Sequence, residues 1–235
     1  MHIVVPVKSF HLAKSRLAPA LSSARRARLA RAMLMGVLKA ASSVSGVSGV
    51  SVVSRQRPDF LDMLPSAVDW IAECPLSHGL NAALTGAAQQ LHAQRVRRIL
   101  ILPSDLPCLQ PVDVEAIVDC AERILAASAC ATLLVPDHRL QGTNALAINL
   151  PLPFDLSYGP YSFNRHSLAA RLAGCKVHTM QNRATEADLD EPCDLHRLRA
   201  RPTSAFSTPI LHTLLATWAG GHHHLLEADG PGWQA

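Results

Sequence analysis

The segment RILILPSDLPCLQP, residues 98–111, decides the fold class. Its four consecutive apolar residues predict a central strand, Arg98–Pro103, that is buried on both faces. Asp105 follows between two prolines, and Pro111 favours the first turn of a helix that continues to about Leu125. An acid held at the end of a central strand suits a divalent metal, although a turn or helix cap would use the same residue.

Short apolar strands and amphipathic helices alternate along the rest of the chain. Further strands are expected at Ile3–Val7, Val47–Val53, Val68–Ala72, Ala131–Val135, Ala145–Leu150 and Lys176–Met180. Helices are expected after a cap at Ser22 or Ser23, and at 80–91, 163–173 and 192–200. Because helices separate the strands, we predict an α/β fold whose mostly parallel sheet carries helices on both faces.

The 235 residues allow one ordinary domain or two small ones. The alternating pattern fills residues 1–200, which we take as the main domain. Residues 201–235 place prolines and glycines around one apolar stretch, Ile210–Trp218, and are expected to form a partly flexible appendage. Three adjacent histidines, His222–His224, could bind a metal, but histidines in a glycine-flanked tail more often have no specific role.

Composition excludes several classes of protein. With 49% hydrophobic and 17% charged residues, global disorder is excluded, and no apolar run is long enough to span a membrane. The apolar start, Met1–Val7, lacks the basic region and cleavage site of a signal peptide. The six cysteines are scattered without a C-x-x-C pair, which argues against a disulfide framework and a zinc knuckle. We expect free thiols in a reducing cytoplasm.

Charge is distributed unevenly. Residues 1–58 hold ten basic residues and no acidic one, since the first acid is Asp59. This asymmetry favours an anionic ligand near the N-terminal quarter, although a solvated helix face accounts for some of the arginines. Nucleic acid is less favoured, because the chain has only three Trp, two Tyr and five Phe to stack bases.

Ligands of open α/β sheets bind beyond the carboxyl ends of the strands, where basic and polar segments fall in this chain. Lys8, Lys14 and Arg16 follow the first strand in a loop and suit a polyphosphate, although the chain has neither a Walker loop nor a G-x-G-x-x-G motif. The alternative is ordinary surface charge. His78, Gly79 and Asn81 precede the helix at 80–91, where they could bind a nucleotide or merely cap the helix.

Two small turns and an acidic pair complete the candidate site. Gln141–Asn144 and Gly159–Phe163 could each bind a carboxylate or phosphate, or could simply be turns. Asp188 and Asp190 lie two residues apart, which puts both carboxylates on one side of an extended chain. They are the plausible second half of a metal site that includes Asp105.

At these residues the sequence resembles a known family, the phospho-acid guanylyltransferases of deazaflavin coenzyme (factor 420) biosynthesis, called CofC or FbiD. The matching motifs cover about residues 1–198 in the family's order. They are VPVK with AKSRL, HGLNAAL, PSDLP, GTNAL, GPxSF and DLDEPxDL. Each motif is weak alone, but together they are specific.

The resemblance implies a nucleotidyltransferase fold and a Mg²⁺-dependent reaction. GMP from GTP would be joined to 2-phospho-L-lactate, phosphoenolpyruvate or 3-phospho-D-glycerate, with release of pyrophosphate. Carried over by motif, Thr143, Gly159 and Ser162 would bind the acid. Asp105, together with Asp188 or Asp190, would bind metal, and Lys8 and Lys14 would bind the triphosphate. A downstream deazaflavin transferase as partner, and a homodimer, are further expectations.

Two departures from the family pattern flank the expected acid pocket. Tyr161 stands where the family has glycine, and Leu140–Gln141 replaces a stretch richer in glycine. Other readings stay open. A sugar-phosphate or molybdopterin nucleotidyltransferase would share the fold, but the glycine-rich opening of the sugar enzymes is absent. A non-catalytic nucleotide-binding domain has no need of three carboxylates at these positions.

Overall fold

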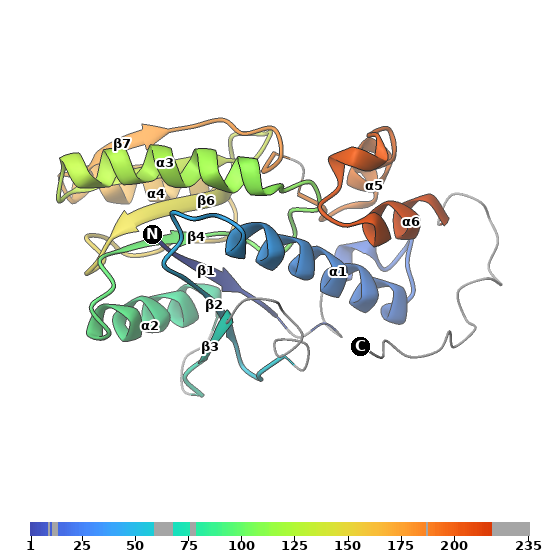
Figure 1. Ribbon diagram of the computed structural model, residues 1–235, viewed down its shortest axis with the longest axis horizontal. Coiled ribbons are helices and arrows are strands. Elements are labelled where there is room, and N and C mark those ends of the chain that lie inside the picture. Colours follow the sequence, from blue (N-terminus) through green and yellow to red (C-terminus); the bar gives the residue numbers. More distant parts are fainter. Residues whose placement is uncertain (9, 11–13, 59–67, 76–78, 187, 218–235) are drawn as a thin grey trace.

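The computed structural model describes residues 1–8, 10, 14–58, 68–75, 79–186 and 188–217 (Figure 1). Seven strands in these residues form one sheet in the order β3-β2-β1-β4-β6-β5-β7. The strands are β1 (His2–Pro6), β2 (Gly49–Ser54), β3 (Val68–Ala72), β4 (Arg98–Ile101), β5 (Ala131–Pro136), β6 (Thr143–Asn149) and β7 (Lys176–Thr179). The predicted strands are therefore confirmed, with small shifts at their ends.

One strand runs against the others. β6 pairs antiparallel with both β4 and β5, whereas every other pairing in the sheet is parallel. The prediction of a mostly parallel sheet is confirmed. Because β6 is reversed, its first residue lies at the edge where the parallel strands end. Thr143 therefore joins the loops that follow β1, β4 and β7.

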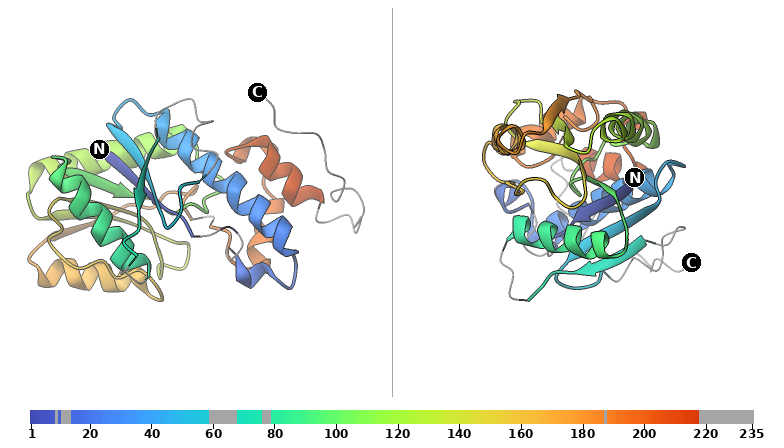
Figure 2. Two further views of the ribbon diagram at one scale, coloured as in Figure 1. Left: turned by 90° about the horizontal axis from the view of Figure 1, so that it is seen from below. Right: turned by 90° about the vertical axis from the view of Figure 1, so that its left-hand side faces the viewer.

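Helices cover both faces of the sheet. The helices are α1 (Ser23–Ser42), α2 (Leu80–Ala93), α3 (Pro111–Ala127), α4 (Ser162–Leu172), α5 (Pro192–Arg199) and α6 (Pro209–Thr217). Buried residues of α1, α3, α5 and α6 share one core cluster, and those of α2 and α4 share the other. Figure 2 shows α2 and α4 on the opposite side of the sheet from α3.

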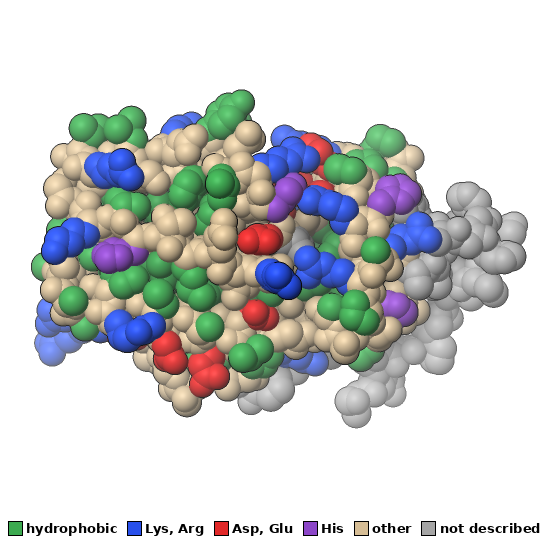
Figure 3. All heavy atoms as spheres, turned by 90° about the horizontal axis from the view of Figure 1, so that it is seen from above, with side chains coloured by type: hydrophobic (Ala, Val, Ile, Leu, Met, Phe, Trp, Pro, Cys, Tyr) green, Lys and Arg blue, Asp and Glu red, His purple; other side chains and the backbone are tan. Residues whose placement is uncertain are grey.

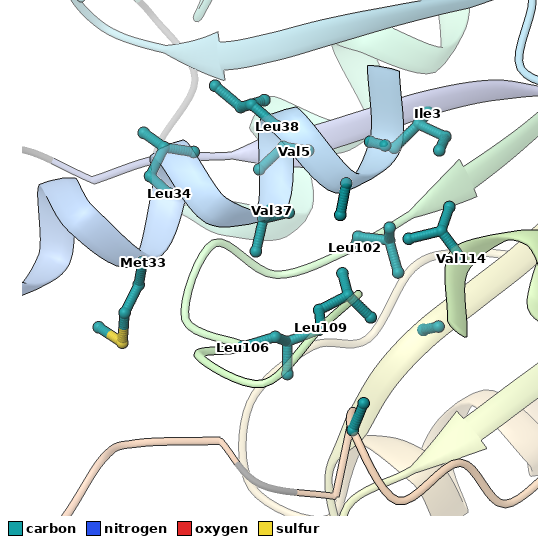
Figure 4. Packing of buried hydrophobic residues seen from close by; sticks show 14 of the residues in the cluster. Ile3, Val5, Met33, Leu34, Val37, Leu38, Leu102, Leu106, Leu109 and Val114 are labelled. Carbon is teal, nitrogen blue, oxygen red and sulfur yellow. The ribbon is translucent and has the colours of Figure 1, made fainter. Parts of the chain in front are cut away.

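The larger core joins helix α1 to the segment that follows β4. Met33, Leu34 and Val37 of α1 are fully buried in the same cluster as Leu102 and Leu106, and Figure 4 shows Val37 pointing toward the segment that carries these two leucines. The three apolar residues of α1 follow helical spacing, and this spacing is what predicted the helix from the sequence. This packing holds the chain between Leu102 and Leu106 in place, and so fixes the position of Asp105.

Helix ends follow the expected capping chemistry. Ser22 is the N-cap of α1 and its side chain accepts a hydrogen bond from the Arg25 amide. Gln110 and Asp113 form a capping box at the start of α3, with Pro111 at the first position. Such caps satisfy amides that have no partner inside the helix.

The segment expected to be an appendage is in part integral to the core. Phe206, Leu211 and Leu215 are buried in the same cluster as α1. The approach is close, because a Cβ built on Gly36 of α1 would lie 2.1 Å from the Ser207 hydroxyl oxygen. Where it is described, this segment therefore packs against the main domain. His222–His224 lie outside the described residues.

The expectation that all cysteines are thiols is wrong for one pair. Cys130 and Cys175 form a disulfide, with their Cα atoms 4.5 Å apart. Cys130 immediately precedes β5 and Cys175 immediately precedes β7, and the first residues of these parallel strands pair with each other. The register therefore places the two cysteines together, although 45 positions separate them in sequence. No helix in the described ranges is long and apolar enough to cross a membrane.

Candidate active site

Four segments meet at the edge where the parallel strands end. The loop after β1 supplies Lys14, the turn after β4 supplies Asp105, and the chain after β7 supplies Asp190. Thr143 begins β6 at the same edge. In the middle of the face seen in Figure 3, acidic side chains lie beside basic ones. The edge therefore combines both signs of charge with polar neutral groups.

Lys14 is the centre of one half of the site, which we call the charged half and which also contains Asp105, Asp188 and Asp190. Its Nζ atom lies 2.5 Å from Asp105 Oδ2 and 2.8 Å from Asp190 Oδ1, and its side chain is only 7% exposed. Burial by itself would lower the pKa of Lys14, but the charges and hydrogen bonds of the two carboxylates outweigh burial and raise it. Lys14 is therefore a fixed cation that connects loops 91 and 176 residues away.

Asp188 brings further negative charge to the same place. Burial is the largest cause that raises its pKa, to about 7, and the nearby carboxylates of Asp105 and Asp190 add to it. Leu189, between the two aspartates, is fully buried. The chain thus alternates a buried apolar side chain with two carboxylates, as the sequence predicted.

Asp194 shapes the acidic loop and was not singled out in the sequence. Its Oδ2 accepts hydrogen bonds from the Asp190 amide at 2.9 Å and the Glu191 amide at 2.7 Å. Burial would raise the pKa of Asp194, but these amides and the Arg197 guanidinium lower it. The sequence signal was available, because Glu191 and Asp194 form a capping box around Pro192.

The other basic residues lie around this cluster. Arg16 and Arg139 each approach Glu191, at 3.6 and 3.7 Å. Both arginines are at least half exposed, so these pairs contribute little to stability. Lys8 is exposed immediately beyond the first strand. Exposed cations in weak pairs can turn to an anionic ligand at low cost.

Neutral polar residues form a second cluster at the same edge of the sheet, which we call the neutral pocket. The Thr143 amide donates to Ser162 Oγ at 2.9 Å, and the Ser162 amide donates to the Gly159 carbonyl at 3.1 Å. Gly159 has φ of 122°, a conformation that side chains rarely adopt. The structure thus brings together the three residues predicted for acid binding, on the start of β6 and the start of α4.

His166 is a member of this pocket that sequence reasoning missed. It is fully buried on α4, its Nδ1 lies 3.0 Å from Thr143 Oγ1, and its Nε2 accepts from the Ser157 amide at 2.8 Å. The signal was the spacing of His166 four residues after Ser162, which places both on one face of a helix. Burial, followed by the charge of Arg165, lowers the pKa of His166 to about 4.

Two residues predicted for nucleotide binding, Gly79 and Asn81, lie at the amino end of α2, next to the turn that carries Gly159. Gly79 is the N-cap of α2, with φ of 90°. Both polar atoms of the Asn81 amide group contact the backbone of Tyr158: Nδ2 donates to the carbonyl at 3.2 Å, and Oδ1 accepts from the amide at 2.6 Å. Asn81 therefore holds the Ser157–Gly159 turn in place. His78 lies outside the described residues.

Comparison with known proteins identifies the family. The sequence model of the family described as "Guanylyl transferase CofC like" matches residues 1–214. This chain belongs to that family. The phosphoenolpyruvate guanylyltransferases of Chloroflexus aggregans and Rubrobacter xylanophilus are 34% and 37% identical to it, each over 84% of this chain and over 94% and 92% of their own length. The 3-phospho-D-glycerate guanylyltransferase of Phenylobacterium zucineum is 32% identical over 88% of this chain and 93% of its own.

Solved structures share the fold of this CofC-like protein at low identity. A nucleotidyl transferase from Methanothermobacter superimposes with a TM-score of 0.56 at 17% identity, covering 84% of this chain and 95% of that one. A Desulfovibrio desulfuricans protein described among nucleotide-diphospho-sugar transferases gives 0.69 at 17% identity, over 92% and 97%. These likenesses establish the nucleotidyltransferase fold.

Both departures from the resembled pattern fall on left-handed backbone. Tyr161 has φ of 57° and Leu140 has φ of 56°, both left-handed and both next to the pocket. Glycine adopts this conformation without steric cost, whereas a residue with a Cβ is strained there. In this CofC-like chain the turn geometry therefore stays left-handed without the glycine. The Tyr161 ring is 59% exposed at the pocket's edge.

The acidic cluster has the donor chemistry of a Mg²⁺ site. Carboxylate oxygens are the ligands that this ion prefers, and Asp105, Asp188 and Asp190 carry more negative charge than Lys14 neutralises. In the described residues, however, no three acidic, histidine or cysteine side chains are already arranged around one point as ligands. Lys14 instead occupies the position between Asp105 and Asp190.

Proposed function

We propose that the protein transfers GMP from GTP to the phosphate of a small three-carbon acid and releases pyrophosphate. The proposal rests mainly on one observation: a charged cluster and a pair of hydroxyl groups lie at the same edge of the sheet. The Lys14–Asp105–Asp190 cluster suits a metal-bound triphosphate, and the Thr143–Ser162 hydroxyl pair suits a carboxylate. The names of the relatives support the same reaction class for this member.

The chemistry is an in-line displacement at the α-phosphorus of GTP. An oxygen of the acid's phosphate forms a bond to that phosphorus while the bond to the bridging oxygen of pyrophosphate breaks, so no proton has to be removed from the nucleophile. Catalysis therefore depends on alignment and on the neutralisation of charge. Lys8, Lys14 and Arg16 would bind the triphosphate, and no nucleophilic side chain is needed.

Mg²⁺ would be held by Asp105, Asp188 and Asp190. When bound, it neutralises charge that develops on the phosphate oxygens. Lys14 would then leave its two carboxylates and contact the triphosphate instead. Gly79 and Asn81, with His78, would lie near the nucleotide at the amino end of α2, where backbone amides favour anions.

The neutral pocket would select the acceptor. Thr143 and Ser162 are buried hydroxyls, 6% and 3% exposed, so a carboxylate bound there would be largely withdrawn from water. Gly159 would let the ligand approach the backbone closely. The pocket thus provides hydrogen-bond donors for the carboxylate, while the acid's phosphate points toward the charged half.

The setting of the reaction is part of the proposal. We place it in the cytoplasm, where GTP is available, with a deazaflavin transferase that consumes the product as a partner. A homodimer stays an expectation to be tested by light scattering. Neither membrane nor nucleic acid is needed as a partner.

The test measures pyrophosphate release by the purified protein with Mg²⁺. GTP is compared with ATP, CTP and UTP, each with 2-phospho-L-lactate, phosphoenolpyruvate or 3-phospho-D-glycerate, with and without the downstream transferase and its acceptor. Release that requires GTP and one of the acids supports the proposal. No release in any combination, from a folded protein, contradicts it.

A matched pair of lysine variants checks the triphosphate subsite. Lys8→Ala removes an exposed cation next to the site, and Lys39→Ala removes an exposed cation from the last turn of α1. The first should raise the KM for GTP, and the second should leave it unchanged. Equal KM values for both variants would remove Lys8 from the proposed subsite.

A further inference from the structure

The hydrogen bonds of His166 determine which of its ring nitrogens carries the proton. A backbone amide can only donate, so the Ser157 amide, 2.8 Å from Nε2, requires a lone pair on that atom. A neutral imidazole with a lone pair on Nε2 carries its proton on Nδ1. Nδ1 lies 3.0 Å from Thr143 Oγ1 and therefore donates to that hydroxyl.

This assignment determines what Thr143 can offer a ligand. The hydroxyl oxygen of Thr143 accepts the hydrogen bond from His166. The backbone amide of Thr143 already donates to Ser162 Oγ. The hydroxyl proton is then left to donate, and no acceptor for it is found in the described part of the chain. Ser162 is in the same state, because its oxygen accepts from the Thr143 amide. The pocket thus holds two hydroxyls with their protons available.

We propose that His166 is a positioning residue of the acid pocket, which holds the Thr143 hydroxyl as a hydrogen-bond donor to the acceptor's carboxylate. This inference rests on the proposed function. Without the Nδ1 proton, the hydroxyl would be free to rotate and to donate to the histidine instead. With it, both the place and the direction of one donor are set before the acid arrives, which lowers the ordering cost of binding.

The surroundings of His166 keep it neutral. The ring is fully buried, and Tyr158 packs edge-on against it with ring centroids 4.7 Å apart. Arg165 is the charged neighbour, and its guanidinium donates to the Ser157 and Tyr158 carbonyls. Both burial and the positive charge of Arg165 lower the pKa of His166, so the neutral ring persists at the pH of an ordinary assay.

Two substitutions separate the two hydrogen bonds. The amide of His166→Asn reaches about as far as Nδ1 and can still donate to Thr143. The amide of His166→Gln reaches about as far as Nε2 and can accept from Ser157, but it leaves Thr143 without its donor. We expect His166→Asn to keep the KM for the acid within about threefold. His166→Gln should raise it about tenfold, since a hydrogen bond to a charged ligand is weakened.

Two readouts separate positioning from a merely structural role. The KM for GTP and kcat should stay unchanged in both variants. Thr143→Val should raise the KM for the acid as His166→Gln does, and the double variant should be no worse than Thr143→Val alone. If the two effects multiply, or if His166→Gln leaves the KM for the acid unchanged, this inference is overturned.

A spectroscopic test does not depend on turnover. In protein labelled with ¹⁵N-histidine at pH 7, the resonance pair lost in His166→Gln should show a protonated Nδ1 and an unprotonated Nε2. A protonated Nε2, or an imidazolium, overturns the inference even if the enzyme is active. Wild-type protein that turns over no acid contradicts the proposed function instead, and the two failures are therefore distinguishable.

Discussion

The two halves of the site are built on different physics. The charged half joins distant loops by the ion pairs of Lys14 with Asp105 and Asp190, and carries an uncompensated carboxyl at Asp188. The neutral half, around Thr143 and His166, is joined by hydrogen bonds between buried groups. Ion pairs rearrange when a charged ligand arrives, whereas a buried network of hydrogen bonds between neutral groups resists change. The charged half is therefore the part that adapts, and the neutral half is the part already formed.

The two halves also respond to acid with opposite signs. The folded pKa of His166, about 4, lies below its ordinary 6.5, so its contribution to stability is lost as the pH falls from 6.5 toward 4. The folded pKa of Asp188, about 7, lies above its ordinary 3.8, so the native state gains stability as the pH falls from 7 toward 4. Acidification therefore reduces the contribution of His166 to stability, and it removes the repulsion between the carboxylate of Asp188 and its neighbours.

The largest expected effect comes from the charged half. Asp105→Asn keeps the size of the side chain but removes a carboxylate that binds Lys14 and would bind the metal. We expect kcat to fall at least about a hundredfold, because preorganised charge is the main source of catalysis here. Asp119→Asn, an exposed position on α3, is the matched control and should keep full activity. Turnover within threefold of wild type would remove Asp105 from the site.

The next effect concerns the C-terminal segment that packs into the larger core. Removing residues 205–235 takes away the buried side chains of Phe206, Leu211 and Leu215, at roughly 1.5–3 kcal/mol each. We expect the shortened protein to lose at least about 5 kcal/mol of unfolding free energy, which urea denaturation measures. Removing only residues 218–235 leaves these side chains in place and serves as control. Equal stability of the two would show that α6 is dispensable.

A substitution in the neutral half should have an intermediate effect. Gly159→Ala forces a Cβ into φ of 122°, at a strain of about 1–3 kcal/mol. We expect the KM for the acid to rise about tenfold while the KM for GTP stays the same. Gly86→Ala is the matched control. It lies inside α2 with open space around its Cβ position, where alanine should stabilise the helix. A proportional rise in both KM values would contradict a separate acid pocket.

A smaller effect should separate stability from activity. Asp188→Asn removes a partly buried carboxyl whose charge is opposed by its neighbours. We expect the Tm to rise by about 2–4 °C at pH 8, with no gain at pH 5, where the carboxyl is already protonated. Turnover should fall at both values. Scanning calorimetry at the two pH values measures the first effect, and a lower Tm at pH 8 would contradict the assigned repulsion.

The smallest effect concerns the strained turn at the pocket. Tyr161→Gly should be more stable than Tyr161→Ala by about 1 kcal/mol, because only glycine accepts φ of 57° without steric cost. The ring itself is mostly exposed, so its loss is common to both variants and cancels. Urea denaturation of the pair measures the difference. Equal stability would show that the turn relaxes when the ring is removed.

Local patterns in the sequence predicted most of the fold. Apolar runs and helical spacing located the strands and helices, because burial imposes a period on the chain. The reversal of β6 and the Cys130–Cys175 disulfide were not predicted, since both depend on strand order. The core packing of Phe206 and Leu211 was also missed, because prolines and glycines nearby indicated a loose tail.

The site was predicted in part for the same reason. Motifs placed Lys14, Asp105 and Thr143 at strand ends, and the structure brings them to one edge. Sequence spacing does not show which carboxylates a lysine will contact or that a histidine on α4 will reach β6. Such contacts link residues 23 to 176 positions apart. They depend on how the elements pack.

The contact between Asn81 and Tyr158 links the two proposed substrate subsites. Asn81 lies in the first turn of α2, whose amino end would meet the nucleotide. Its side-chain amide bonds the backbone of Tyr158, 77 residues away, in the turn that also carries Gly159. If the proposed subsites are correct, a shift of α2 on binding GTP would be passed to the turn that would receive the acid. Occupancy of one subsite should change affinity at the other, and by reciprocity the second should change the first by the same factor. The side chain of Asn81 would then influence the order in which the two substrates bind.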